Sequence, residues 1–303
     1  MPLPLLLSLL LWGCGQLEEV FIEEDLLQRP EAKRCADCHA SIYEEWKKSR
    51  HYNAWTSESF RVETENYAKL KCLSCHAPHQ VDPEKKPALR VEFRKDGVSC
   101  VACHFKEETG AMHGPLKVWS PPHPSQKDLA YKNSNLCAGC HRETYKEWKA
   151  TKTKTTCQNC HMPSVGKKDL IQKFPFYLFH RAKPRTSHEF PALRAKSEDV
   201  EVKLSGNRLI LTNVGVPHNL PTADQGNPKL YLVARVYYEG GGVRTVRRIF
   251  SPASKTALPY RVPISVRLPP GDIKLVEVKL LRKLAWSDKR DTIAELTLKV
   301  PSP

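Results

Sequence analysis

The sequence predicts an α + β protein in which a mostly helical or irregular N-terminal domain is followed by a small β-sandwich domain. Two observations support this division. Between Cys35 and His161 the pattern Cys-x-x-Cys-His occurs five times, and aromatic residues follow two of these motifs at helical spacing. From about residue 198 apolar and polar residues alternate between Pro and Gly interruptions, which is typical of short strands. We therefore expect one domain over residues 31–195 and a second over residues 196–303.

The repeated motif uses ten of the eleven cysteines. Its two thiols can attach to the vinyl groups of a haem, and the following His can bind the iron as proximal ligand. Zinc sites do not need a His directly after each Cys pair, and five redox disulfides across two-residue gaps would be unusual. The sequence therefore predicts five covalently bound c-type haems. The attachment residues are Cys35, Cys38, Cys72, Cys75, Cys100, Cys103, Cys137, Cys140, Cys157 and Cys160, and the proximal ligands are His39, His76, His104, His141 and His161.

The chain is basic, with a formal net charge of +15. Basic proteins commonly bind nucleic acids or anionic membranes. Here two propionates on each haem would bring about ten negative charges in total, which Lys and Arg side chains would offset. A basic surface for an acidic partner protein is the alternative, and we expect no nucleic-acid partner. Leu, Ile, Val and Phe are modest in number before residue 165, so haem faces are expected to supply much of the core there.

The N-terminus has the features of an export signal. Residues 1–14 are apolar, too short to span a membrane as a mature helix, and end in Leu11-Trp12-Gly13-Cys14, which resembles a bacterial lipoprotein cleavage site. Cys14 is then the lipidated residue, and residues 15–30 are a tether. Because Trp12 is bulky and no Lys or Arg precedes the apolar run, a plain signal peptide or a short uncleaved anchor is the alternative. Each version exports the chain, to the periplasm or the cell surface.

Two of the motifs are followed by the same aromatic spacing. After His39 and again after His141, a Tyr stands at i+4 and a Trp at i+7, so that all three side chains share one helical face. We expect this face to lie against the attached haem. The aromatic residues are Tyr43 and Trp46 in the first copy and Tyr145 and Trp148 in the second.

The two copies differ at the position of a candidate second ligand. On a continuous helix His51 would lie about 18 Å along the axis from His39. It therefore cannot bind the same iron, and as a ligand it would serve a different haem. The matching position in the second copy is Thr153, flanked by Lys152 and Lys154. A distal ligand there must come from elsewhere or is missing.

Several stretches carry a family resemblance. They are Cys-x-x-Cys-His-x3-Tyr-x2-Trp-x2-Ser-x-His from Cys35 to His51, Gly97-Val98-Ser99 before Cys100, His113-Gly114-Pro115, and Met162-Pro163 after His161. Over roughly residues 31–220 the chain resembles the cytochrome c-554 family, which is related in motif to hydroxylamine oxidoreductase and octahaem tetrathionate reductase. The resemblance implies closely stacked haems, mostly with His on both sides of the iron, and roles in electron transfer or in nitrogen or sulfur redox chemistry.

Candidate distal ligands can be counted. Seven His remain beyond the five proximal ones, whereas the chain has three Met, of which Met162 adjoins a proximal His and cannot reach across its own haem. We therefore expect His/His coordination and low reduction potentials. The candidates are His51 and His113, which match family motif positions, His188 and His218, which resemble two late ligand motifs of multihaem cytochromes, and His123, which lies between two prolines.

The C-terminal domain shows no nucleophile–base pair and no metal-binding cluster in its sequence. We expect its loop around His218 to cap a haem and to hold the two domains together, the alternative being that the domain only packs. The expected strands cover residues 200–204, 208–212, 229–238, 243–250, 273–281 and 292–300.

Three functions fit these features. The favoured one is an exported carrier that moves electrons between redox partner proteins, because enough His are present to complete most irons. The second is a reductase or oxidase of small nitrogen or sulfur compounds with one open haem at the copy that carries Thr153, where Lys152, Lys154 or one of His79 and His180 would line the pocket. The third is a homo-oligomer, as a subunit of a cytochrome filament, or a subunit docked on a membrane redox complex.

Overall fold

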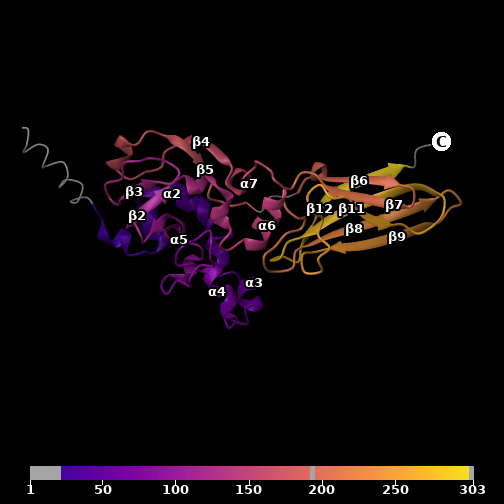
Figure 1. The fold of residues 1–303 in the computed structure, drawn as a ribbon, viewed down its shortest axis with the longest axis horizontal. Coiled ribbons are helices and arrows are strands. Elements are labelled where there is room, and N and C mark those ends of the chain that lie inside the picture. Colours follow the sequence, from indigo (N-terminus) through magenta and orange to yellow (C-terminus); the bar gives the residue numbers. More distant parts are fainter. Residues whose placement is uncertain (1–21, 192–194, 300–303) are drawn as a thin grey trace, which may run out of the picture. The chain divides into compact units, whose positions relative to one another are not determined.

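The computed structural model describes residues 22–191 and 195–299. Residues 1–14 with Cys14 lie outside this part, as does the tether up to residue 21. The chain divides into two compact units, one of residues 1–139 and 156–191 and one of residues 140–155 and 192–303 (Figure 1). The expected domain boundary after residue 195 stays a prediction. Residues 140–155 were expected in the first domain but group with the C-terminal strands.

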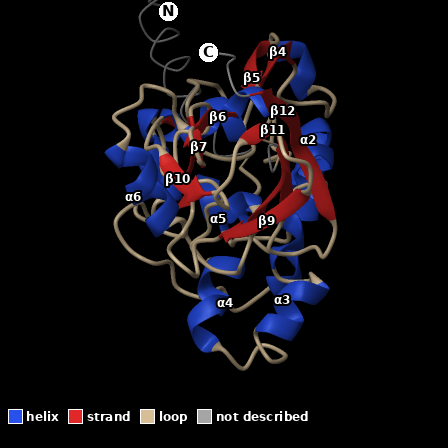
Figure 2. Cartoon of the chain, turned by 90° about the vertical axis from the view of Figure 1, so that its right-hand side faces the viewer, coloured by secondary structure: helices blue, strands red, loops and turns tan. Residues whose placement is uncertain are grey.

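The first unit consists of short helices and small sheets joined by long irregular segments (Figure 2). Its helices are α2 (Ala32–Lys47), α3 (Glu58–Glu63), α4 (Leu70–His76), α5 (Cys100–His104) and α7 (Cys157–His161). Its strands are β1 (Phe105–Lys106), β2 (Ala111–Gly114) and β3 (Ser125–Lys127) in one sheet, and β4 (Ser164–Lys168) and β5 (Lys183–Thr186) in another. Its buried apolar cluster is small and contains Trp55, Phe60, Leu73 and Ala77.

Each of the five copies of the motif lies within a helix or directly before one. Helices α4, α5 and α7 each contain a complete motif and end at its His. In α2 the backbone leaves helical geometry at His39, with φ −108° and ψ 41°. Helix α6 (Arg142–Ala150) begins directly after His141, which has φ −101° and ψ 51°. The helix expected to run on through the first motif is therefore interrupted at its His, which turns the imidazole independently of the aromatic residues that follow.

The second unit is a two-sheet sandwich together with α6 (Figure 1). One sheet has the order β10-β7-β6 and the other β12-β11-β8-β9, and every strand pair is antiparallel. The α + β class and the six expected strands are confirmed, whereas β10 was missed. The strands are β6 (Val200–Ser205), β7 (Arg208–Asn213), β8 (Lys229–Tyr238), β9 (Val243–Phe250), β10 (Ile264–Arg267), β11 (Ile273–Lys283) and β12 (Arg290–Lys299).

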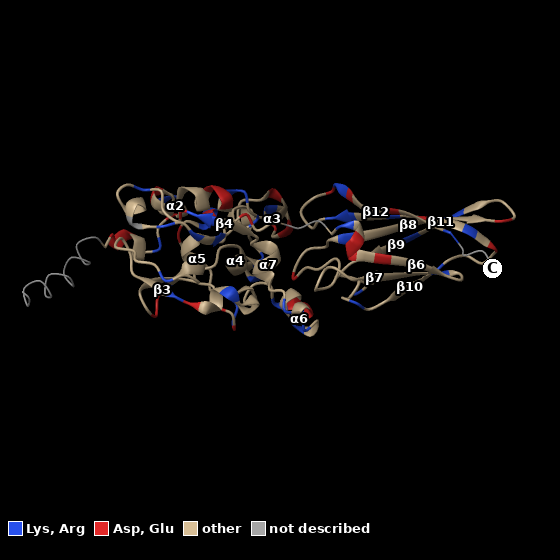
Figure 3. Cartoon of the chain, turned by 90° about the horizontal axis from the view of Figure 1, so that it is seen from above, with Lys and Arg blue, Asp and Glu red and all other residues tan. Residues whose placement is uncertain are grey.

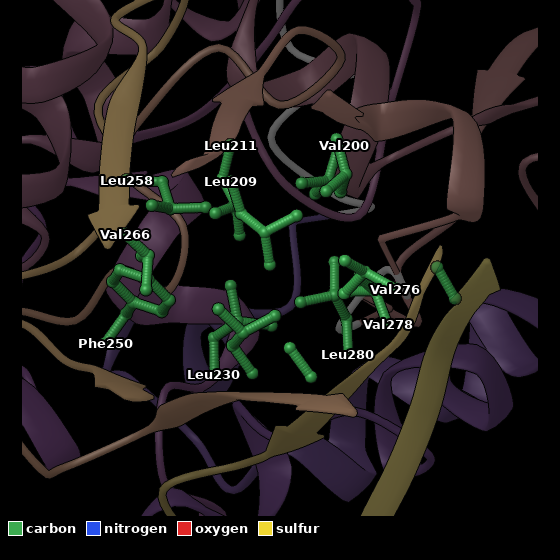
Figure 4. Packing of buried hydrophobic residues seen from close by; sticks show 14 of the residues in the cluster. Val200, Leu209, Leu211, Leu230, Phe250, Leu258, Val266, Val276, Val278 and Leu280 are labelled. Carbon is green, nitrogen blue, oxygen red and sulfur yellow. The ribbon is translucent and has the colours of Figure 1, made fainter. Parts of the chain in front are cut away.

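The core of the second unit lies between its two sheets (Figure 4). Leu209 and Leu211 from β7 point toward Leu230 from β8 and Leu280 from β11, and each of these side chains is fully buried. Alternate residues of these strands fill the interior, as the period-two pattern predicts. This unit therefore has an apolar core made by its own side chains, which supports the loops at its ends.

Charged side chains of both signs are interspersed over both units (Figure 3). The idea that Lys and Arg offset haem propionates stays a prediction. Within the described residues, no helix combines the length and the apolar character needed to cross a membrane.

Candidate functional site: the Cys-x-x-Cys-His motifs

The ten thiols of the five motifs are partly buried and none is in a disulfide. Within the described residues, no group of three or more His, Cys, Asp or Glu is arranged to hold a metal ion by itself. Each motif thus presents two reduced sulfurs and one imidazole, which is the donor set that covalent haem attachment requires.

Four of the five motif imidazoles are oriented by a hydrogen bond from Nδ1 to a backbone carbonyl. The pairs are His39 with Leu170 O at 2.7 Å, His76 with Ala54 O at 2.6 Å, His104 with His113 O at 2.7 Å and His161 with Pro191 O at 3.1 Å. A carbonyl can only accept, so Nδ1 carries the proton and Nε2 keeps its lone pair for a metal. Backbone far away in the sequence therefore fixes the tautomer that an iron ligand needs.

The aromatic repeat is present in the structure. The Tyr and Trp rings of the first copy have their centroids 5.6 Å apart and those of the second copy 5.5 Å apart. Each Trp donates its indole N–H to a backbone carbonyl, Trp46 to Val98 O at 2.9 Å and Trp148 to Thr155 O at 2.8 Å. The two helices are thus the same local unit, and each is anchored to the loop that follows or faces it.

His123 faces His39. Their ring centroids are 6.5 Å apart. Two imidazoles that share one metal ion, with bonds of about 2.0 Å and roughly 1.2 Å from each nitrogen to its ring centre, would have centroids about 6.4 Å apart. Burial lowers the pKa of both imidazoles, which favours the neutral form that can coordinate a metal. The spacing therefore fits a His/His site.

His188 faces His104 in the same way. Their centroids are 6.3 Å apart, and burial lowers the pKa of His104 and brings that of His188 to about 4. The loop that carries His188 is tied to α2, because Glu45 accepts the backbone N–H of His188 at 3.0 Å and two bonds from the guanidinium of Arg185 at 2.7 and 2.8 Å. This second pair therefore also has the spacing of a His/His site, held by a mostly buried ion pair.

The second motif has an aromatic neighbour. Phe60 stacks on the His76 ring with centroids 3.7 Å apart and planes 7° apart. The other face of Phe60 belongs to the small apolar cluster with Trp55 and Leu73. His76 is therefore fixed both by its Nδ1 bond and by stacking.

The fourth motif differs from the rest in what faces its imidazole. Nδ1 of His141 lies 3.6 Å from a carboxylate oxygen of Asp224. The same carboxylate accepts the backbone N–H of Glu143 and the hydroxyl of Thr144, the latter at 2.9 Å. Burial would raise the pKa of Asp224, but the nearby His141 and the hydrogen bond from the Glu143 N–H hold that pKa below its usual value. An anion therefore stands where the other four motifs have a neutral carbonyl.

The segment from residue 218 to residue 224 is docked on α6. Glu147 accepts the backbone N–H of Asn219 at 3.2 Å, its side-chain amide at 2.7 Å and the Thr222 hydroxyl at 2.7 Å. Within the same segment, Nδ1 of His218 bonds the carbonyl of Asn219 at 2.9 Å. The loop around His218 thus packs on the helix of the fourth motif, and the role of His218 as a distal ligand stays a prediction.

The other two candidate distal ligands have different surroundings. The His51 ring packs against Phe190, with centroids 4.3 Å apart. His113 bonds Asp128 through Nδ1 at 3.2 Å and Thr109 through Nε2 at 2.8 Å, while its backbone carbonyl orients His104. Both stay predictions as ligands.

Thiols of different motifs meet inside the first unit. The Cys35 thiol lies beside that of Cys100, and the Cys137 thiol lies beside that of Cys157. The neighbouring thiol and burial raise the pKa of Cys100, and that of Cys137 rises for the same reasons. The first motif therefore adjoins the third, and the fourth adjoins the fifth.

Comparison with known proteins supports this interpretation of the motifs. Residues 34–105, which contain the first three motifs, match the family model of cytochrome c554 and c-prime. The fold is similar to that of a penta-heme cytochrome c552 from Thermochromatium tepidum, at a TM-score of 0.58 and 17% identity, over 91% of this chain and 100% of that one. These two findings support a multihaem c-type cytochrome family for the chain. A search of curated proteins finds no match.

The match supports haem c as the cofactor of the motifs and electron transfer as the class of activity. The expected resemblance to the cytochrome c-554 family is therefore confirmed. Sequence reasoning missed Asp224, the pair of Glu45 and Arg185, and Phe60. Asp224, Arg185 and Phe60 lie outside the motifs, and Glu45 stands at an unspecified position of the first one. Asp224 closely follows the stretch around His218 that drew attention to this loop.

Proposed function

We propose that the cytochrome binds five haems and carries electrons between redox partner proteins outside the cytoplasm. When bound, haem supplies reversible one-electron chemistry at its iron. The observation that carries the proposal is that all five motifs have an ordered imidazole, four of them with Nδ1 bonded to a carbonyl and the fifth facing a carboxylate. This supports haem sites at all five motifs, including the two that lie outside the part matched by the family model.

The two His pairs support a carrier rather than an enzyme. His39 with His123 and His104 with His188 are spaced as for two axial ligands, and an iron with both positions filled cannot bind a substrate. The thiol contact between Cys35 and Cys100 supports close approach of two attached groups at their edges. Residues of the first unit thus favour a chain of neighbouring six-coordinate irons.

The test is a count of haems and of spin states in the exported protein. Intact mass should exceed that of the polypeptide by five haems, and low-temperature EPR should show at least two low-spin centres with two His ligands. A mass increase of fewer than five haems would remove the proposal. The same preparation, extracted from membranes with detergent, tests whether Cys14 carries lipid, as anchoring at the periplasmic or outer cell surface requires.

A second function, reduction or oxidation of a small molecule at one open iron, is favoured by one observation. Thr153 takes the place of His51 in the second copy, and its hydroxyl accepts the backbone N–H of Thr155 at 3.2 Å in a local turn. If this function holds, about one haem in five will be high-spin and will bind nitric oxide, and turnover with nitrite, hydroxylamine or tetrathionate will be measurable. Five low-spin irons and no measurable turnover would exclude this second function and retain the electron carrier.

A further inference from the structure

The five motif imidazoles do not face the same kind of hydrogen-bond acceptor. Four face backbone carbonyls, and His141 faces the carboxylate of Asp224 at 3.6 Å. The difference is one of charge. A carbonyl presents a dipole, whereas a carboxylate presents a full negative charge that draws the Nδ1 proton and makes the imidazole a stronger electron donor through Nε2.

Asp224 is built into its place. Its side chain is 15 % exposed, and its oxygens accept the Glu143 backbone N–H and the Thr144 hydroxyl at the start of α6. The docking of Asn219 and Thr222 on Glu147 holds the preceding loop on the same helix. The carboxylate is thus held in a fixed position on α6, and this helix begins directly after His141.

The distance between the two groups is that of an ion pair and slightly long for a hydrogen bond. The His141 side chain is 57 % exposed, so its ring has room for the small turn that a hydrogen bond needs. The carboxylate has no such room, because two donors of α6 hold it. The acceptor is therefore fixed in advance, and the imidazole is the partner that adjusts.

We propose that Asp224 is a positioning residue that accepts a hydrogen bond from Nδ1 of His141. It thereby gives the fourth haem site the most negative reduction potential of the five. The inference rests on the proposed five-haem function and adds an order to the sites. A more electron-rich imidazole and a nearby anion both stabilise ferric over ferrous iron. The fourth site then holds electrons least firmly and passes them to the others.

A structural explanation of Asp224 competes with this one. An acid that accepts N–H groups at the start of a helix stabilises that helix whatever the neighbouring His does. The substitution Asp224→Asn separates the two roles, because the amide oxygen still accepts N–H groups but carries no charge. The substitution Glu147→Gln is the matched control, since it weakens the docking of the same loop on the same helix without changing the charge next to His141.

The experiment is a spectroelectrochemical titration of the full five-haem protein, with intact mass as a check of haem content. In Asp224→Asn the reduction potential of one haem should rise, and the other four potentials should stay unchanged. The rise corresponds to roughly a tenfold change in the ferric-to-ferrous ratio, about 59 mV for one electron. Asp224→Glu should restore the low value, and Glu147→Gln should leave all five couples in place.

Two outcomes overturn the inference alone, with five haems present in every variant. One is that no couple rises in Asp224→Asn, and the other is that Glu147→Gln raises the same couple equally. A mass showing no haem on Cys137 and Cys140 would overturn the inference together with the proposed five-haem function.

Discussion

The ion pair of Glu45 and Arg185 offers the sharpest test of how the first unit positions a ligand. The two side chains are 17 % and 7 % exposed and make a bidentate contact, and Glu45 also accepts the backbone N–H of His188. In Glu45→Gln the Arg185 guanidinium stays buried without its counter-charge. Breaking a buried pair from one side destabilises a protein by about 3 kcal/mol. We expect a loss of that size in the free energy of unfolding of the haem-loaded protein.

The assay follows unfolding in guanidinium through the Soret band, with EPR of the folded protein as a second readout. Because the loop of His188 loses its tie to α2, the signal of one low-spin iron should broaden or shift. The control is Glu44→Gln, since Glu44 is 61 % exposed and pairs with Lys47 at 3.3 Å on the helix surface, a contact worth about 0.5 kcal/mol or less. If both variants unfold at the same denaturant concentration with identical EPR spectra, the positioning role of Glu45 is refuted.

Three further substitutions test other contacts. Gly97→Ala should lower the free energy of unfolding by about 2 kcal/mol or more, because φ is +59° and a Cβ would lie 2.2 Å from a backbone oxygen. Gly110→Ala, with φ +61° and open space around the Cβ, should lower it by about 1 kcal/mol. Equal losses would contradict the steric argument. Asn213→Ala should lower the free energy of thermal unfolding by about 3 kcal/mol, since this fully buried side chain makes three hydrogen bonds to the loop after β7. An unchanged melting temperature would show that the loop does not need these bonds. His123→Ala should convert one low-spin iron to high-spin in EPR, and added imidazole should reverse this change. The control is His79→Ala, which should change no signal, because the His79 ring bonds a surface carboxylate. Unaltered low-spin signals in His123→Ala would exclude His123 as a ligand.

The fold of the second unit could be predicted because its information is local. Alternation of apolar residues defined the strands, and the turn at Gly206 joined the first hairpin, β6 with β7, as expected. The strand β10 was missed because it is four residues long and follows a Pro-rich stretch. A pattern of period two needs more residues than that to be distinguished from an irregular segment.

The sequence indicated the motifs and individual candidate ligands such as His123 and His188, but not which of these residues face each other. Cys and His at fixed spacing indicate the cofactor, because attachment chemistry constrains neighbouring residues. The partners of these His come from distant sequence. His39 is oriented by Leu170 O and faces His123, and no spacing rule connects them. A backbone carbonyl also has no residue signature at all, so these acceptors cannot be found from sequence patterns.

The two copies of the aromatic repeat show how similar local structures acquire different properties. His39 and His141 have nearly the same backbone angles, and each precedes a helix with Tyr and Trp on one face. The surroundings then diverge, because Leu170 O approaches His39 while Asp224 approaches His141. Since the repeat supplies the same ligand in both places, a difference in potential between these two sites must come from the acceptor, the distal side or the solvent exposure. Such differences bias the net movement of electrons between the irons of one chain toward those of higher potential. Variation of distant contacts around a constant motif can create such a difference without disturbing the attachment of the haem.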